Sequence, residues 1–149
     1  MMRSKRFEPI QEIVNLSAQD LSKAMGDAAR QVAELETQFE QLKSYRDEYV
    51  RNASKATAID AVKLQNYRSF LDRLGEAIRQ HAIKLQTARS EYERRRQQWS
   101  TKRIEAESLG RVIDRFRKEE RQISDQREQR EGDDAAMRIS LARLEAGNS

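Results

Sequence analysis

Few residues in this sequence have the type and spacing that catalysis requires. His81 is the single histidine among 149 residues, and cysteine is absent, which removes the thiol nucleophile, the thiolate metal ligand and the disulfide. There is no Gly-rich phosphate loop and no HExxH motif. His81 falls on an apolar helical face, where a histidine at the edge of a core is more common than a catalytic base. The sequence therefore predicts a protein that is not an enzyme and that uses no cofactor and no metal.

A run of three arginines occupies residues 94–96, with Tyr92 and Trp99 close to it. Such a cluster is one pattern of nucleic-acid binding, because phosphates attract concentrated positive charge. Glu91 and Glu93 dilute that charge. We therefore favour two core aromatics flanked by solvated arginines, and we expect no nucleic acid among the partners.

The overall composition indicates long helices. Lys and Arg total 29, Asp and Glu total 25, the net charge is +4, and 36% of the residues are charged. One proline and five glycines are too few for the recurrent turns of a sheet. No apolar run reaches the ~18 residues of a membrane span, and the basic start lacks the apolar segment of a secretory signal. We therefore expect a cytoplasmic protein that does not insert into a membrane.

The first part of the chain carries apolar side chains at alternating steps of four and three residues. This spacing predicts a coiled-coil seam on a helix over residues 10–52, with Pro9 in its first turn, where a missing N–H costs nothing. The polar residues 53–57 then predict a turn. The seam positions are Ile10, Val14, Ser17, Leu21, Met25, Ala28, Val32, Leu35, Phe39, Leu42, Arg46 and Tyr49.

A second helix is expected over residues 58–131. Thr57 with Asp60 three residues later resembles a capping box at its start, and Gly132 suits the position just past its end. A short C-terminal helix or tail is expected at residues 133–149. The second seam contains Leu64, Tyr67, Leu71, Leu74, Ile78, His81, Leu85, Ala88, Tyr92, Arg95, Trp99, Lys102, Ala106, Leu109, Ile113, Phe116 and Ile123.

Two seams joined by a short turn predict an all-α fold. We expect one domain over residues 1–149, in which two long helices form an antiparallel coiled-coil hairpin and the second helix is the longer. In the expected register, paired residue numbers sum to about 113, so Tyr45 lies beside Phe70 and Val32 beside His81. We expect the free chain to be a monomer.

The expected register leaves part of the second helix without a partner in the chain. The first helix runs out near Lys102, and the segment before Ile10 is too short and too polar to cover the rest of the second seam. The apolar seam residues beyond Lys102 are Leu109, Ile113, Phe116 and Ile123. An apolar stripe of this kind indicates a binding site for another protein, although the helix could instead bend back or two copies could pair there.

A second candidate surface lies nearer the turn. Tyr45, Phe70 and Ala77 flank the seam, and two large aromatics at the rim of a two-stranded coil cannot both be fully buried. They either broaden the core or form an exposed patch of the kind that docks proteins.

The residues around this patch carry a resemblance to a known family. They read Gln38-x-x-x-Leu42-x-x-Tyr45-x-x-x-Tyr49 and Asn66-Tyr67-x-x-Phe70-Leu71-x-x-Leu74-x-x-Ala77-Ile78-x-x-His81. The sequence resembles the FliJ family, the small soluble component of the bacterial flagellar type III export apparatus. The match is most specific between Gln38 and Leu85, while length, charge richness and the two-helix pattern match along most of the chain.

The resemblance implies a non-catalytic, stalk-like coiled coil that links the ring of the flagellar export ATPase to the cytoplasmic domain of the export gate and escorts export chaperones. It implies a cytoplasmic location, peripheral to the inner membrane at the flagellar base. The open end of the hairpin is implied to enter the ATPase ring, which makes the stripe beyond Lys102 a candidate contact for the ATPase or a chaperone. The implied gate-contact residues are Gln38, Leu42, Tyr45, Tyr49, Phe70, Leu74, Ala77 and His81. The alternatives are a basic coiled coil that binds nucleic acid and a structural rod that self-assembles.

Overall fold

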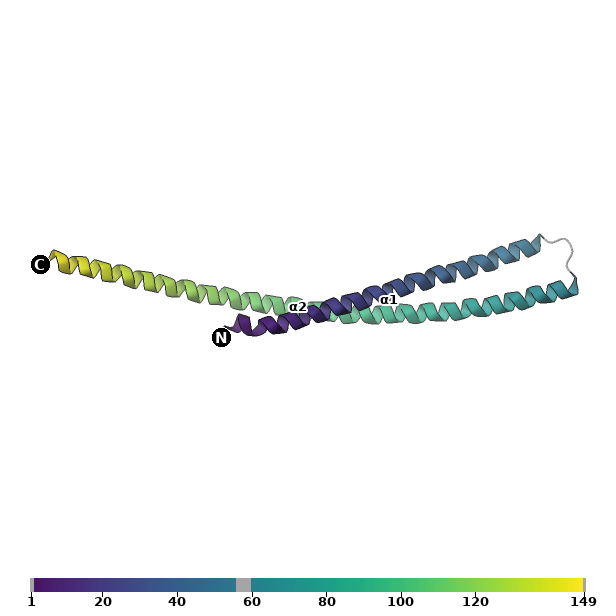
Figure 1. Cartoon of the computed structure of the whole chain (residues 1–149), viewed down its shortest axis with the longest axis horizontal. Helices are drawn as coiled ribbons and strands as arrows, with labels where there is room; N and C mark the ends of the chain where they lie inside the picture. The colour runs from purple at the N-terminus through teal and green to yellow at the C-terminus, as the bar shows by residue number, and fades with distance from the viewer. Residues whose placement is uncertain (1, 56–59, 149) are drawn as a thin grey trace. The chain divides into compact units, whose positions relative to one another are not determined.

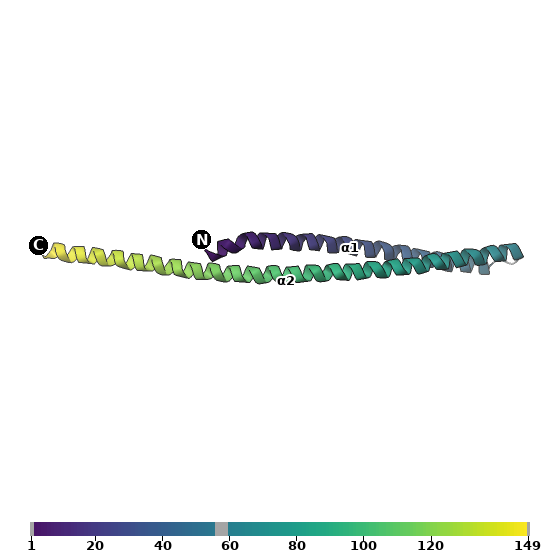
Figure 2. The same ribbon diagram turned by 90° about the horizontal axis from the view of Figure 1, so that it is seen from below.

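The computed structural model describes residues 2–55 and 60–148. It contains two α-helices, α1 (Arg3–Ser54) and α2 (Ala61–Gly147), and no strand within the described residues. α1 has 52 residues and α2 has 87, and both are unbroken in Figures 1 and 2. The predicted all-α fold of two long helices, with the second longer than the first, is confirmed.

The contacts between the helices fall into two compact units. The hairpin unit is Ser17–Lys102, and the terminal unit combines Met1–Leu16 with Arg103–Ser149. Each unit therefore contains a part of both helices. The predicted gate-contact residues lie in the hairpin unit, and the predicted stripe beyond Lys102 lies in the terminal unit.

The two helices run antiparallel within the hairpin unit. Glu36 of α1 contacts Arg89 of α2, whereas Tyr49, further along α1, contacts Phe70, which comes earlier in α2. The predicted seam faces this interface. Its most buried members here are Leu74, Ile78 and Leu85, with exposed fractions of 8%, 8% and 4%. Most other seam positions are half-buried, because a helix packed against a single partner covers only one of its faces.

The register differs from the predicted one. Tyr49 contacts both Tyr67 and Phe70, with residue numbers that sum to 116 and 119, and Phe7 contacts Phe116, with a sum of 123 rather than about 113. Tyr45 does contact Phe70, as predicted. His81 shares a groove with Leu42, and its pairing with Val32 stays a prediction. The physical reason is the connection, because α1 ends at Ser54 and α2 begins only at Ala61, both later than the pattern predicts.

The start of α2 is capped by Asp60 itself. The backbone N–H of Lys63 donates to Asp60 Oδ1 at 2.8 Å, and the N–H of Leu64 donates to the Asp60 carbonyl at 3.0 Å. These are the bonds of an N-cap residue, which accepts otherwise orphaned N–H groups of the first turn. The predicted capping role of Thr57 lies outside the described residues.

α1 begins earlier than predicted, at Arg3 instead of residue 10, so Pro9 lies inside the helix and not in its first turn. The seam continues through Gln11 and Phe7, which are half-buried, to Ser4, which is 4% exposed. Ile10, a predicted seam residue, is 47% exposed. Packing of the first turns against α2 outweighs the hydrogen bond that a proline removes from a helix.

α2 ends later than predicted. It continues through Gly132 to Gly147, so the expected break at Gly132 and the separate short C-terminal helix are wrong. A single glycine lowers helix stability by only about 1 kcal/mol, which good helix formers on both sides can offset. Every described residue from Arg121 onward is exposed. Neither helix contains, within the described residues, a stretch long and apolar enough to cross a membrane.

Candidate functional site

Four aromatic side chains gather near the turn end of the hairpin unit. Tyr49 packs against Phe70 with ring centroids 4.5 Å apart, and it stacks on Tyr67 at 5.4 Å. The rings of Tyr45 and Phe70 form a T-shaped pair with centroids 6.1 Å apart. We call Tyr45, Tyr49, Tyr67 and Phe70 the aromatic cluster. Pairs of this geometry contribute about 0.5–1.5 kcal/mol beyond the area they bury, so the cluster has a defined shape.

A shallow groove of about 450 Å³ borders the aromatic cluster. It is lined by Gln38, Gln41, Leu42, Tyr45 and His81. Tyr45 is 52% exposed even though it contacts Phe70, so about half of its surface is accessible beside the groove. The Nδ1 atom of His81 is buried and has no hydrogen-bond partner among the described residues. The groove therefore combines an apolar wall with polar side chains at its edges.

The structure brings most of the predicted gate-contact residues to this region. Gln38, Leu42, Tyr45 and His81 line the groove, and Tyr49 and Phe70 belong to the aromatic cluster. Ala77 is half-buried, and Leu74 is only 8% exposed, so little of the Leu74 side chain is accessible to a partner. That these residues contact a partner stays a prediction.

Gln41 and Tyr67 belong to this region but were not among the predicted site residues. Gln41 lines the groove, and Tyr67 stacks on Tyr49. Tyr67 stands within the second motif of the family resemblance, between Asn66 and Phe70, so the sequence contained a signal for it. Gln41 is found only from its place beside Leu42 and Tyr45 in the folded chain.

A second groove, of about 590 Å³, lies on the α1 side of Tyr45. Three of its lining residues are carboxylates, Glu36, Glu40 and Glu48. Glu36 forms an ion pair with Arg89 of α2 at 3.0 Å, and Glu40 forms one with Lys43 at 3.0 Å. Tyr45 thus stands between a mostly apolar groove and a groove edged by partly neutralised carboxylates.

The arginine run at residues 94–96 is engaged in local ion pairs. Arg94 and Arg95 contact Glu91 at 2.6 and 2.8 Å, and Arg96 contacts Glu93 at 2.7 Å. Hydrogen bonds from Arg94 and Arg95 lower the pKa of Glu91 to about 2. This confirms that the neighbouring glutamates dilute the positive charge of the run. Within the described residues, no group of acidic, histidine or cysteine side chains is arranged to hold a metal ion.

In the terminal unit, the start of α1 covers part of the stripe that was expected to lack a partner. Ile113 is 0% exposed, and the ring of Phe116 packs on Phe7 at 5.5 Å. Leu109 is half-buried, whereas Ile123 is 59% exposed. The expectation that all four residues lack a partner in the chain is therefore wrong, because α1 extends seven residues beyond its predicted start. Binding of another protein here stays a prediction.

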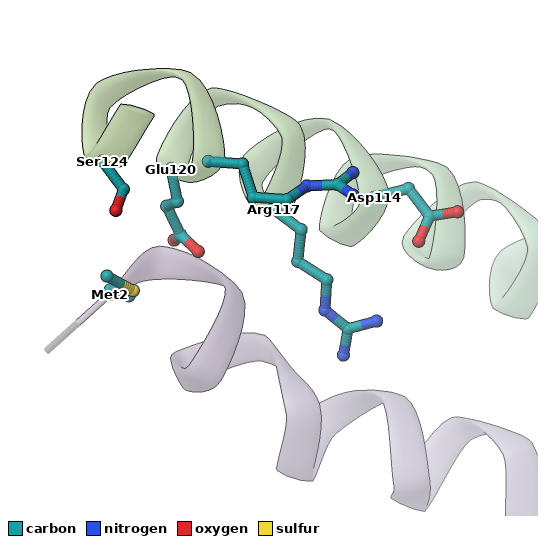
Figure 3. A pocket seen from close by; sticks show the side chains of 6 residues that line it. Met2, Asp114, Arg117, Glu120 and Ser124 are labelled. Atoms are coloured by element: carbon teal, nitrogen blue, oxygen red, sulfur yellow. The ribbon is translucent and has the colours of Figure 1, made fainter. Parts of the chain in front are cut away.

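A pocket of about 590 Å³ lies where the start of α1 meets α2 (Figure 3). Its lining residues are Met2, Asp114, Arg117, Glu120, Arg121 and Ser124. In Figure 3 the carboxylate of Glu120 points toward the first turn of α1. The backbone N–H of Ser4 donates to one oxygen of this carboxylate at 3.1 Å, and the Ser4 hydroxyl donates to the other at 2.6 Å.

An antiparallel pair of long helices with a heptad seam and an exposed aromatic cluster defines the class of helical-hairpin coiled-coil proteins. Within that class, the family model described as the flagellar FliJ protein matches residues 3–145. The chain therefore belongs to the FliJ family and is a component of the flagellar export apparatus. Members of this family are structural, non-enzymatic proteins that associate with other export components. The chain matches no curated protein and no solved structure closely enough to identify a further relative.

Proposed function

We propose that this protein is a stalk-like coiled coil that links the export ATPase ring to the cytoplasmic domain of the export gate and escorts export chaperones. It does so in the cytoplasm, as a monomer when free, at the inner membrane beneath the flagellum. The family match supports the export role. The observation that carries the gate contact is the aromatic cluster beside an open groove, in the two segments with the most specific family motifs.

The gate-contact surface consists of the groove and the exposed part of the aromatic cluster. Tyr45 is its anchor, because it is 52% exposed and is held by Phe70. A tyrosine held in place by a neighbouring ring binds with little loss of side-chain entropy, and its hydroxyl adds a polar contact at the rim. Gln38 and His81 supply polar edges on either side. Glu40 and Glu48 border the adjacent groove, so a partner surface with basic residues next to an apolar anchor site fits best.

The ATPase and chaperone contacts lie in the terminal unit. Ile123 continues the α2 seam, and the exposed apolar residues of the C-terminal part of α2 follow it at helical spacing. They are Met137, Leu141 and Leu144, with exposed fractions of 65%, 54% and 65%. Leu109, Ile113 and Phe116 precede them on the same seam, where Phe7 of α1 packs on Phe116. A partner helix that covers these side chains gains about 1.5–3 kcal/mol for each large side chain that it buries fully.

The gate contact is tested by calorimetric titration of the full chain with the gate's cytoplasmic domain. Tyr45→Ala and Phe70→Ala should each weaken binding by about 2 kcal/mol or more, roughly 30-fold, because anchor residues of an interface carry most of its affinity. Ile83→Ala is the matched control, since Ile83 is an apolar α2 residue with 61% exposure that lines neither groove.

Helicity and thermal midpoint are recorded for all three variants. If both aromatic variants keep their helicity and bind the gate domain with the affinity of the parent chain, the gate-contact surface does not lie in this region. If the parent chain binds neither the gate domain nor the export ATPase, it does not have the proposed linking role.

A further inference from the structure

The first turns of α1 are attached to α2 by a small set of specific contacts. Ser4 makes two hydrogen bonds to Glu120, Phe7 packs on Phe116, and Glu8 forms an ion pair with Arg117 at 3.1 Å. The guanidinium of Arg3 also lies over the Phe116 ring, 5.7 Å from its centroid. All of these contacts come from residues 3–8, which we call the N-terminal latch.

Glu120 supplies a cap that α1 lacks. The first turn of α1 contains no acidic residue, and the first N–H groups of any helix have no partner within the helix. The Glu120 carboxylate accepts one of these N–H groups, from Ser4, and it stands at the positive end of the α1 dipole. The hydrogen bonds from Ser4 lower the pKa of Glu120. The latch is therefore held by a charged group of the other helix.

Pro9 lies at the C-terminal edge of the latch. It is inside α1, where its missing N–H leaves the helix without one bond of the first turns, and its ring crowds the carbonyl of Lys5. A proline inside a helix is a common site of bending. Residues 3–8 can therefore separate from the rest of α1 at Pro9 with the loss of fewer helix hydrogen bonds than a break at a neighbouring residue would cost.

The latch is also loosely surrounded. Besides the pocket of Figure 3, a second groove of about 430 Å³ lies at the same end of α1 and is lined by Met2, Arg3, Phe116 and Ile123, among others. Met2 is 54% exposed between these two hollows. A segment with few buried contacts and open space on its flanks belongs to the low-stability end of a fold, where local opening is favoured over global unfolding.

We propose that residues 3–8 act as a releasable latch that opens about Pro9 and covers Phe116 of α2 when closed. In the closed state Phe7 packs on the Phe116 ring and the guanidinium of Arg3 lies over it. Opening uncovers Phe116 beside Ile123, which is already exposed, so that the exposed apolar stripe of α2 becomes longer. The latch is a property of this chain alone and does not rest on the proposed export contacts.

Thiol labelling of the full chain tests the latch, because the natural sequence contains no cysteine. Ser4→Cys places a reporter in the latch, at a position 4% exposed, and Val14→Cys places one beyond Pro9, at a position 7% exposed. Both positions are closed to reagent, so each labelling rate reports opening. The Ser4→Cys reporter should label faster than the Val14→Cys reporter, although the two positions are almost equally buried.

Glu120→Gln, which removes the charge of the cap, should raise the labelling rate of the Ser4→Cys reporter about tenfold and leave that of Val14→Cys unchanged. Glu128→Gln, at an exposed α2 position away from the latch, is the matched control and should change neither rate. Pro9→Ala should slow labelling at Ser4→Cys toward the rate at Val14→Cys, because it restores the missing helix bond.

Phe7→Cys is a second reporter, which keeps Ser4 and its bonds to Glu120 intact and lies in the latch at a half-buried position. It should follow the Ser4→Cys reporter in its response to Glu120→Gln and to Pro9→Ala. Equal labelling rates at Ser4→Cys and Val14→Cys would overturn the proposal, since the segment then opens with the whole unit. Insensitivity of both the Ser4→Cys and Phe7→Cys reporters to Glu120→Gln would overturn it as well.

Discussion

At the scale of single residues, two carboxylates decide where the helices begin. Asp60 accepts the N–H of Lys63 within its own helix, whereas Glu120 accepts the N–H of Ser4 from the other helix. Both satisfy donors that would otherwise face water or remain unpaired. The first cap is local and can be found from sequence, because Asp60 is a favoured capping residue before a helical segment. The second joins residues 116 positions apart and depends on the register.

Removal of the local cap should destabilise α2 at its start. Asp60→Ala is expected to lower the free energy of unfolding by about 0.5–2 kcal/mol, since Lys63 loses the acceptor for its backbone N–H. Urea titration followed by circular dichroism measures the change. Asp72→Ala, at an exposed position in the interior of α2, should shift the midpoint much less. Equal shifts for the two variants would show that the loss comes from surface charge and not from the cap.

The burial of Ile113 makes a second prediction at this scale. Ile113→Ala should cost about 2–5 kcal/mol of stability, because Ile113 is the most completely buried side chain described. Ile104→Ala removes the same atoms at a position that is 60% exposed, and it should cost far less. Chemical denaturation of both variants gives the comparison. A small loss for Ile113→Ala would mean that α1 does not cover Ile113 in solution.

At the scale of the elements, each helix extends past a residue that commonly marks a helix boundary. α1 runs through Pro9 and α2 runs through Gly132. The reasons differ. The residues before Pro9 gain contacts with Phe116 and Glu120, so tertiary packing supports them. The residues after Gly132 are all exposed, so their helix depends on intrinsic propensity and local contacts.

Gly132 therefore offers a test of the C-terminal part of α2. Gly132→Ala should strengthen the helix by about 1 kcal/mol, since an added Cβ meets no atom within 4 Å. Amide hydrogen exchange should show slower exchange over residues 128–140, with no change in the hairpin unit. Gly26→Ala, where an added Cβ also has open space, is the control and should slow exchange only around its own position in α1. Unaltered exchange near Gly132→Ala would indicate that this segment is not helical in the free chain.

At the scale of the whole molecule, the abundant charge is organised into local pairs along the helices. Most of the described ion pairs join residues three or four apart, such as Arg79 with Glu76 at 2.6 Å and Arg103 with Glu107 at 3.2 Å. Each exposed pair of this type contributes only a few tenths of a kcal/mol. Because the apolar core of these helices is only one seam wide, the small contributions of many such pairs together matter for the stability of the fold.

Stability should accordingly fall in acid. The pKa values of Glu76, Glu93 and Glu120 are lowered, and that of Glu91 is lowered from 4.5 to about 2, in each case mainly by hydrogen bonds to the carboxylate. A carboxyl group whose pKa is lower in the folded than in the unfolded chain stabilises the fold at pH values above its unfolded pKa. This stabilisation is lost as the pH falls through the folded pKa. The melting temperature should therefore decrease between pH 4.5 and pH 2.

The double variant Glu91→Gln with Glu93→Gln should flatten this pH dependence, and Glu34→Gln, at an exposed α1 position, should not. Added salt should reduce the difference between the parent and the double variant, because it screens exposed charges. A pH profile of the double variant that matches the parent would show that these two carboxylates contribute nothing to acid unfolding.

The sequence alone determined the class of fold and the face on which each helix packs. The alternating steps of four and three residues predicted the seam because a heptad pattern is a local property of one helix. The same pattern led to the Tyr45–Phe70 contact, since a short connection between two antiparallel helices brings these two positions close in any similar register. The motifs around Gln38 and Phe70 identified the family from residue types alone.

Only the tertiary structure decided the register and the two outer ends of the hairpin. A seam pattern is periodic, so a shift by one heptad satisfies it equally well, and the connection between Ser54 and Ala61 selects the pairing. That pairing places Ser4 against Glu120 and Phe7 against Phe116. The segment Arg3–Glu8 contains good helix formers, but it is too short and too close to Pro9 to predict a helix by itself. It becomes helical because the contacts with α2 compensate for its ordering.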